Sequence, residues 1–378
     1  MHHRHIERAQ LKRKLEQGIS IHMPAPRRIG KTWTINRLAT DLRDAGWIAV
    51  EIDVEGIETP EDFAKKLCQQ IEEQLPIRER LTEKLRHRFT SILGGQYNGT
   101  PLDALAKVNA IEFAETLIAS LNEAQQNTVI LVDEIAYFYL MLAQADAKKA
   151  HTFAYQMRAL QQRYRNVRWL LTGSIGLNTI ARRYGIEGAF VDFETYILEP
   201  FTPEQALSYV RDPRIQQQFN HLFDADDATF HAMFDDLGWL APFYLKLIAN
   251  EVRPSAKGAD GISPRATVDD FKAAFEKLLR PNRKSEFAVW PEHINKNLPK
   301  NDRDIALYVL ETLSQHVDGE TTETLLAGAQ KRQGSVTKRQ VRDVLDMLYN
   351  DGLITLSNER YCFRSGLIRR YWKEYGVE

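Results

Sequence analysis

The stretch from residue 19 to residue 34 constrains the fold more than any other part of the chain. Its sequence, ISIHMPAPRRIGKTWT, begins with alternating apolar residues, which predict a short buried strand. A loop follows, and after Gly-Lys-Thr at 30–32 the pattern becomes helical. Strand, loop and helix in this order are the context of a phosphate-binding loop, in which backbone N–H groups and the first helical turn form a concave anion site.

Two side chains at the end of this loop suit a nucleotide phosphate. The amine of Lys31 can reach β- and γ-phosphates, and the hydroxyl of Thr32 can bind Mg²⁺. The usual motif has glycine where this chain has Ala25, which costs little if Ala25 keeps a negative φ, and Pro24 and Pro26 stiffen the turn. A chance Gly-Lys-Thr in a surface loop is the alternative, and the flanking pattern disfavours it. The expected nucleotide-binding residues are Ala25, Pro26, Arg27, Arg28, Ile29, Gly30, Lys31, Thr32 and Trp33.

A second stretch, Thr128–Glu134, reads TVILVDE. Its continuous aliphatic run predicts a strand buried on both faces of a parallel sheet, and its two acids fall where such sheets place ligands. We expect Asp133 to hold Mg²⁺ and Glu134 to polarise the attacking water. An ordinary strand that ends in a polar turn is the alternative, and the upstream loop disfavours it.

A third buried strand is predicted at 168–174, RWLLTGS. In P-loop ATPases the strand between the loop strand and the acidic strand carries a polar group that senses the γ-phosphate, and Thr172 or Ser174 could fill this role. We favour Ser174, although a plain turn after a core strand would also explain these residues. Further on, Arg182 or Arg183 could act as an arginine finger toward a neighbouring subunit, but a solvated helix face is the more common explanation of such a pair.

Composition and length exclude several classes of protein. A chain of 378 residues is too long for one ordinary core, and 43% apolar with 27% charged residues is typical of a soluble globular protein. The formal net charge of −1 does not indicate nucleic acid binding, and no apolar run is long enough to span a membrane. Two distant cysteines argue against a disulfide framework, so we expect a reducing, cytoplasmic compartment.

The pattern along the chain predicts four parts. They are an α/β core with a P-loop at 1–201, a helical lid at 202–280, a linker at 281–301 and a winged-helix domain at 302–378. Within the core we expect a helical stretch over residues 59–93, interrupted at Pro76, and a loop at 94–101.

The winged-helix prediction is based on three helical patterns followed by a hairpin, with turn residues near position 358. The third helix carries Lys338, Arg339 and Arg342, which could contact DNA phosphates or bases. Acidic residues lie on the same helix, so a protein-docking or autoinhibitory module is slightly favoured over a DNA reader.

Taken together, PRRIGKT, VDE and LTGSIG resemble the archaeal-type ATPases of the STAND class, which are relatives of AAA+ proteins. The resemblance covers about residues 1–255 and implies a sheet with the strand order 5-1-4-3-2. It also implies a lid whose proline packs against adenine. Gly238 and Pro242 resemble this glycine–proline motif, with a longer spacing than the tight Gly-x-Pro.

The resemblance implies an ATP-hydrolysing switch with ATP and Mg²⁺ as cofactors. In this hypothesis Lys31, Glu134 and Ser174 are the catalytic residues, Thr32 and Asp133 hold the metal, and Pro242 contacts the base. Such a switch would form a homo-oligomer or recruit an effector protein, with a role in defence or mobile-element conflict. The alternatives are a DNA-loading or transposition ATPase that binds DNA through the winged helix, a small-molecule kinase, and a nucleotide-binding scaffold without hydrolysis.

Overall fold

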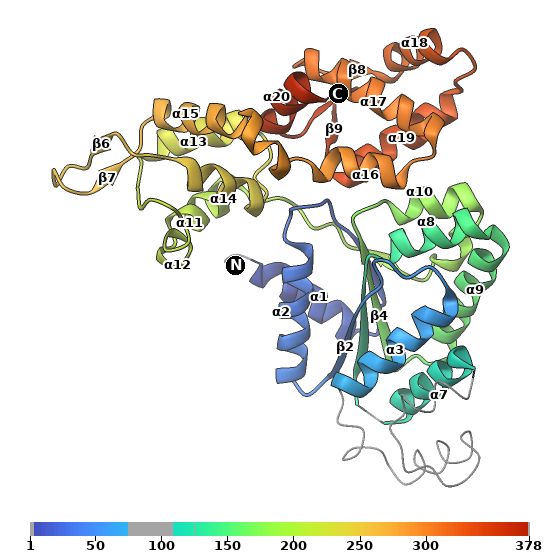
Figure 1. Cartoon of the computed structure of the whole chain (residues 1–378). Coiled ribbons are helices and arrows are strands. Elements are labelled where there is room, and N and C mark those ends of the chain that lie inside the picture. Colours follow the sequence, from blue (N-terminus) through green and yellow to red (C-terminus); the bar gives the residue numbers. More distant parts are fainter. Residues whose placement is uncertain (1–3, 75–108, 125, 377–378) are drawn as a thin grey trace. The chain divides into compact units, whose positions relative to one another are not determined.

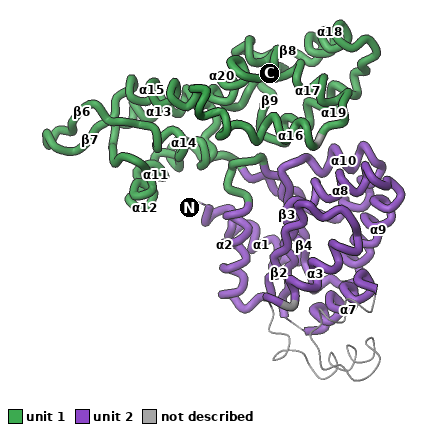
Figure 2. Tube along the Cα trace, viewed as in Figure 1, with its two compact units in different colours: residues 1–3, 26–31, 199–378 green, residues 4–25, 32–198 purple. Residues whose placement is uncertain are grey.

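The computed structural model describes residues 4–74, 109–124 and 126–376. The predicted loop at 94–101 and most of the predicted helical stretch at 59–93 lie outside these residues. Two compact units make up the chain: unit 1 contains residues 1–3, 26–31 and 199–378, and unit 2 contains residues 4–25 and 32–198 (Figure 2). We describe each unit by itself.

Unit 2 is built on a five-stranded parallel sheet with the order β2-β3-β4-β1-β5. Read from the other edge, this is the expected order 5-1-4-3-2, so the predicted fold class is confirmed. The central strands are buried on both faces because their residues are almost all aliphatic. The fifth strand has only two residues. The strands are β1 (Ile21–Pro24), β2 (Ile48–Asp53), β3 (Thr128–Asp133), β4 (Val167–Gly173) and β5 (Glu194–Thr195).

Helices cover both faces of this sheet (Figure 1). Helices α1 and α2 lie on one face, and α3, α8 and α9 lie on the other, as right-handed crossovers between parallel strands require. Phe63 packs against Phe138 and Phe153 on the second face, with both pairs of ring centroids 5.3 Å apart. The helices of unit 2 are α1 (His5–Glu16), α2 (Lys31–Asp44), α3 (Pro60–Gln74), α7 (Ala110–Glu123), α8 (Ile135–Ala145), α9 (Ala147–Arg163), α10 (Leu177–Tyr184) and the short η1 (Glu187–Ala189).

The first part of unit 1 is a group of helices that starts at a capping box on Thr202. The segment at 254–266 contains a small antiparallel hairpin. The elements are α11 (Pro203–Arg211), α12 (Pro213–Gln216), α13 (Asp227–Leu237), α14 (Pro242–Glu251), β6 (Ala256–Lys257), β7 (Pro264–Arg265) and α15 (Val268–Leu278).

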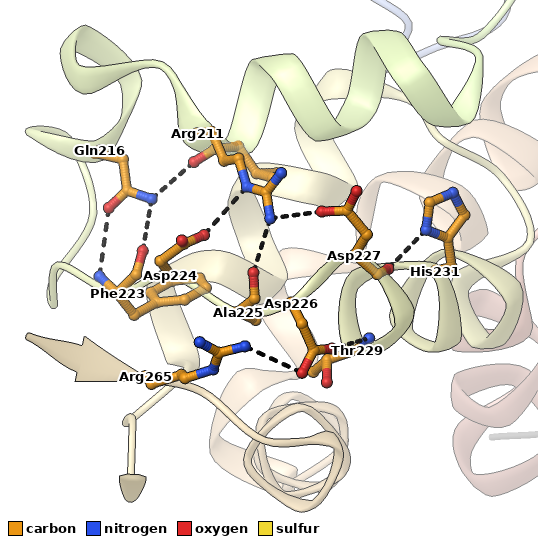
Figure 3. Close-up of polar contacts among 11 residues, drawn as sticks. Arg211, Gln216, Phe223, Asp224, Ala225, Asp226, Asp227, Thr229, His231 and Arg265 are labelled. Atoms are coloured by element: carbon orange, nitrogen blue, oxygen red, sulfur yellow. Dashed lines mark hydrogen bonds and ion pairs between the residues drawn. The ribbon is translucent and has the colours of Figure 1, made fainter. Parts of the chain in front are cut away.

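A polar cluster around Arg211 joins α11 to the segment that leads into α13 (Figure 3). The Arg211 guanidinium donates to Asp224 Oδ1 at 3.1 Å and to the carbonyl of Ala225 at 2.8 Å, and it pairs with Asp227 Oδ1 at 2.8 Å. Its Cζ atom also lies 5.1 Å from the ring centroid of Phe230. We call these five residues the Arg211 cluster. Two carboxylates and a backbone carbonyl accept hydrogen bonds from this guanidinium. These contacts hold the turn before α13 in place.

The C-terminal part of unit 1 contains three helices and a three-stranded antiparallel sheet with the order β8-β10-β9. The three predicted helices and the predicted hairpin are present in this order. A last helix, α20, follows the hairpin and was not expected. The elements are α17 (Lys300–Gln315), β8 (Glu320–Thr321), α18 (Thr322–Gln333), α19 (Lys338–Asp351), β9 (Ile354–Ser357), β10 (Arg360–Phe363) and α20 (Gly366–Tyr375).

The segment predicted to be a linker contains two helical elements, η2 (Pro281–Glu286) and α16 (Val289–Asn297). Trp290, Ile294 and Leu298 are 1%, 2% and 6% exposed. Their four-residue spacing places them on one buried helical face, which explains why this segment is ordered. No helix in the described part of the chain has the length and apolar character that a membrane crossing requires.

Candidate active site

The carboxyl ends of β3 and β4 bring polar side chains together at one edge of the sheet in unit 2. Thr32 Oγ1 donates to Asp133 Oδ2 at 3.1 Å, and Thr172 Oγ1 donates to Asp133 Oδ1 at 2.6 Å. The register of the two strands explains the second contact, because Val132 is paired with Leu171 and the next residues on each strand lie side by side. Two hydroxyl groups from different elements therefore orient one carboxylate.

Glu134 follows at the N-terminus of α8 in a left-handed backbone conformation, with φ 58° and ψ 31°. A left-handed residue other than glycine costs about 1–2 kcal/mol, so the surroundings must hold it in place. Ser174 does so in part, because its N–H and its hydroxyl donate to Glu134 Oε2 at 3.1 and 3.0 Å. Sequence reasoning selected both residues separately and gave no sign that they contact each other.

The loop starts at Ala25, which is 1% exposed and donates its N–H to the carbonyl of Gly173 at 3.2 Å. Ala25 is not among the described residues with positive φ, so its methyl group is tolerated as expected. Arg28 and Gly30 do have positive φ, at 71° and 93°. The loop is therefore anchored beside β4 at its first residue and bonded to β3 through Thr32 at its end.

Residues 26–31 of the loop pack within unit 1. Arg27 Nε donates to His293 Nδ1 at 3.0 Å, and the Cζ atom of Arg28 lies 4.1 Å from the ring centroid of Phe243. Pro26 is partly buried, whereas Ile29 and Lys31 are 1% and 8% exposed. Lys31 directly precedes Thr32, which forms the hydrogen bond to Asp133.

The other predicted residues lie at different places. Trp33 is in the first turn of α2, where the Cζ atom of Arg8 lies 5.6 Å from its ring. Pro242 is the buried first residue of α14 in unit 1. Arg182 and Arg183 are in the last turn of α10, and Arg182 is exposed.

Sequence reasoning gave no role to Asp53, which ends β2. Asp53 is paired in register with Asp133, so a third carboxylate belongs to this edge of the sheet. Burial raises the pKa of Asp53, and the nearby charges of Asp133, Glu55 and Glu134 raise it further against the lowering effect of the Glu55 backbone N–H. The available signal was the position of an acid at the carboxyl end of a strand next to β3.

The donor set at this edge fits Mg²⁺. Thr32 and Asp133 offer a hydroxyl and a carboxylate oxygen 3.1 Å apart, and Mg²⁺ prefers oxygen ligands from one or two such side chains together with nucleotide phosphates. The sheet order and this arrangement of a loop lysine, a threonine and a strand-end aspartate agree with the fold that the P-loop motif predicts.

Comparisons with known proteins agree with this fold. A model of a protein family described as an AAA-like domain matches residues 1–100. The Walker-type ATPase PABY2304 of Pyrococcus abyssi has a similar structure, with a TM-score of 0.64 and 16% identity over 98% of this chain and 95% of that chain. The first finding supports the expected relation to AAA proteins over residues 1–100, and the second shows that the two chains share a fold.

Weaker similarities involve other archaeal proteins. The Aeropyrum pernix ORC1 protein, solved in complex with DNA, gives a TM-score of 0.40 and 14% identity over 99% of this chain and 93% of that chain. Cdc6p from Pyrobaculum aerophilum gives a TM-score of 0.42 and 12% identity over 95% of this chain and 89% of that chain. The search of curated proteins found no match.

Proposed function

We propose that this protein is an ATP-hydrolysing switch of the STAND class, in which the bound nucleotide controls oligomerisation or engagement of a partner. The observation that carries the proposal is the hydrogen bond from Thr32 to Asp133, with Lys31 directly before the threonine and Glu134 directly after the aspartate. A phosphate-binding lysine, a metal-binding pair and an acid for water are the parts that such an ATPase needs.

Each residue has a distinct part in the proposed reaction. Lys31 and the loop N–H groups bind the β- and γ-phosphates, and Glu134 orients the attacking water. Thr32 and Asp133 would hold Mg²⁺, which supplies charge neutralisation on the phosphates when it is bound. Ser174 donates to the γ-phosphate, and Pro242 contacts the adenine.

Nucleotide-dependent switching requires that the two states of the protein bind ATP and ADP with different affinities. We therefore propose that ATP favours an assembled or partner-binding state, with defence or mobile-element conflict as the biological setting. Sizing the protein with ADP and with a non-hydrolysable ATP analogue tests this step. The same size and the same partner binding with both nucleotides would exclude switching while leaving the ATPase activity intact.

Phosphate release by wild type and by Lys31→Ala tests the ATPase itself. Loss of the lysine should lower turnover by about 10²-fold or more, because it removes a charge that stabilises the phosphates in the transition state. Arg37→Ala is the matched control, since this exposed arginine lies further along the same helix. Equal turnover in Lys31→Ala and Arg37→Ala would refute the assignment, and ATP binding without any phosphate release would indicate a scaffold.

A second candidate function, a DNA-binding ATPase, is favoured by α19. Lys338, Arg339 and Arg342 are exposed near the N-terminus of this helix, and Lys338 pairs with Glu323 at 3.1 Å. We propose that the C-terminal helices and hairpin form a winged helix with α19 as its reading helix.

Neutralising all three basic residues of α19 should then abolish salt-sensitive binding to duplex DNA. Changing the exposed Lys148, Lys149 and Lys272 is the control for total charge. If the two triple variants bind DNA equally, α19 is not the contact surface.

A further inference from the structure

A groove in unit 1, outside the site described above, lies between helices α11 and α13. Its volume is about 670 Å³, which is within the size range of cavities that receive small ligands or side chains. Among its lining residues, Glu204, Leu207 and Ser208 belong to α11, whereas Asp227 and His231 belong to α13. We call this cavity the α11–α13 groove. Its lining combines acids with an apolar side chain.

The charged residues of the groove are mostly acidic. Glu204, Asp212 and Asp227 line it together with a single arginine, Arg211. Arg211 already pairs with Asp227, and Asp212 pairs with Arg214. No lysine or arginine in the described part of the chain forms an ion pair with Glu204. The groove therefore suits a partner that brings a cation and apolar atoms together.

The hairpin of β6 and β7 presents this combination. It extends away from the helices α13 and α15 of the same unit, so its tip can reach another molecule (Figure 1). Ile262, in the turn of the hairpin, is 83% exposed. Lys257 is also exposed, and it forms no hydrogen bond or ion pair with any residue that the structure describes.

The tip of this hairpin is held in one conformation by its own hydrogen bonds. Asp260 Oδ1 accepts from the N–H groups of Ile262 and Ser263, both at 2.9 Å. Across the turn, the N–H of Gly258 donates to the carbonyl of Ser263 at 2.8 Å. A loop that is already ordered loses little conformational entropy when it binds, so the exposed Ile262 is presented at low cost.

The Arg211 cluster connects the base of the hairpin to the groove (Figure 3). The N–H of Asp224 donates to the carbonyl of Pro264 at 3.2 Å, and its carbonyl accepts from the N–H of Ala266 at 2.8 Å. Its carboxylate accepts from Arg211, which lines the groove. Hairpin and groove are thus held in a fixed relation within one chain. Two different surfaces on one frame form a head-to-tail contact, which repeats from copy to copy as a ring or an open chain.

We propose that the β6–β7 hairpin of one copy of this protein binds in the α11–α13 groove of the next copy. Lys257 then pairs with Glu204 of the next copy, and Ile262 packs against Leu207. The two side chains that lack partners of their kind within the chain thereby satisfy each other between chains. This inference deepens the proposed function, because it names the surfaces through which copies of the switch assemble.

Mixing two full-length variants tests the contact. Ile262→Asp disables the hairpin, and Ser208→Trp fills the groove; both positions are exposed, so neither change disturbs a core. By sedimentation with ADP and with a non-hydrolysable ATP analogue, each variant alone should self-associate about 10-fold or more weakly than wild type. A mixture should form a dimer through the one intact hairpin and the one intact groove. Growth should stop there, because the other two surfaces are blocked.

A charge exchange tests the pairing of the two residues. Lys257→Glu and Glu204→Lys should each weaken self-association by about 5-fold at low salt. The double variant should return to within about twofold of wild type, since the pair is restored with its charges reversed. Val317→Asp is the matched control, because Val317 is an exposed apolar residue, at 66%, that belongs to neither surface. Its self-association should equal that of wild type.

The outcomes separate this inference from the proposed function. A mixed dimer and recovery in the charge exchange support the inference. Wild-type association that is unchanged by Ile262→Asp and Ser208→Trp overturns it, as does a wild type that stays monomeric with both nucleotides or a mixture that grows beyond a dimer. None of these results changes the outcome of the Lys31→Ala assay. Association through hairpin and groove without any ATP hydrolysis would overturn the proposed function and leave this inference standing.

Discussion

Two polar networks of this molecule hold acidic side chains in different ways. At the sheet edge of unit 2, Asp133 and Glu134 accept from the hydroxyls of Thr32, Thr172 and Ser174. In the Arg211 cluster of unit 1, Asp224 and Asp227 share one guanidinium. The first network uses neutral donors in these contacts, and the second uses an opposite charge.

This difference indicates what each network does. A hydroxyl can rotate and exchange its partner for a metal, a phosphate or water. A guanidinium that bonds several partners at once stabilises the local structure, so its removal lowers the local stability. We expect changes at the sheet edge to alter chemistry with little effect on folding, and changes in the Arg211 cluster to alter local stability with little effect on chemistry. The predictions below test this contrast.

The largest expected effect is on turnover. Asp133→Asn should slow ATP hydrolysis by about 10²–10³-fold, because it removes the charge that would bind the metal. The thermal midpoint should stay close to that of wild type, since the asparagine oxygen can still accept from Thr172 and its NH2 group can donate to the Thr32 hydroxyl oxygen. Steady-state phosphate release and a thermal melt measure the two quantities. A large loss of stability with full turnover would show that Asp133 acts in folding and not in chemistry.

Arg211→Ala should destabilise the helices around the Arg211 cluster by about 1–2 kcal/mol, because it leaves the partly buried carbonyl of Ala225 and the Phe230 ring without their partner. Hydrogen exchange in α11 and α13 reports this local change better than a global melt. Turnover per folded molecule should change less than about twofold. Unchanged protection in both helices would show that the cluster is not structural.

Asp53→Asn should stabilise unit 2 at neutral pH, by less than the Arg211 effect. Burial raises the pKa of Asp53, so its charged form is disfavoured in the folded state. Stability should rise as the pH falls through the folded pKa toward the ordinary value of 3.8. Denaturant melts across this range should show the benefit of Asp53→Asn at neutral pH and its disappearance in acid. A variant less stable than wild type at pH 7 would contradict the prediction.

The smallest effect is expected at Asp226, next to the Arg211 cluster. Its contribution to stability changes with pH in the opposite direction to that of Asp53. Hydrogen bonds from Thr229 hold the pKa of Asp226 below its ordinary value, with a further contribution from Arg265. Its contribution to the N-terminus of α13 is therefore present above pH 3.8 and is lost as the pH falls through the folded pKa. Hydrogen exchange of α13 in acid measures this loss, and Asp226→Asn should remove the pH dependence.

Local sequence patterns predicted the central sheet well, because strands such as Thr128–Asp133 carry one unbroken aliphatic signal. The same patterns placed Thr32 and Asp133 as partners, since a phosphate loop and an acidic strand have known positions in this type of sheet. The segment that forms helix α16 was predicted to be a linker, because it has few apolar residues. Their helical spacing around Trp290 becomes meaningful only once it is known that they are buried in a core.

Contacts between distant residues could not be predicted. Nothing in the sequence links Ser174 to Glu134, because their contact depends on how closely β4 packs on α8. Arg211 is one of many charged residues by sequence alone, and its role depends on a turn that brings Asp224 and Asp227 to the same guanidinium. Tertiary packing decides both contacts.

The most direct test of the central claim compares phosphate release by wild type and Glu134→Gln under conditions where both bind ATP. The proposed function predicts that the variant binds ATP at least as tightly as wild type and releases phosphate about 10²–10³-fold more slowly. Equal rates in the two proteins, or a wild type that binds no ATP, would contradict it.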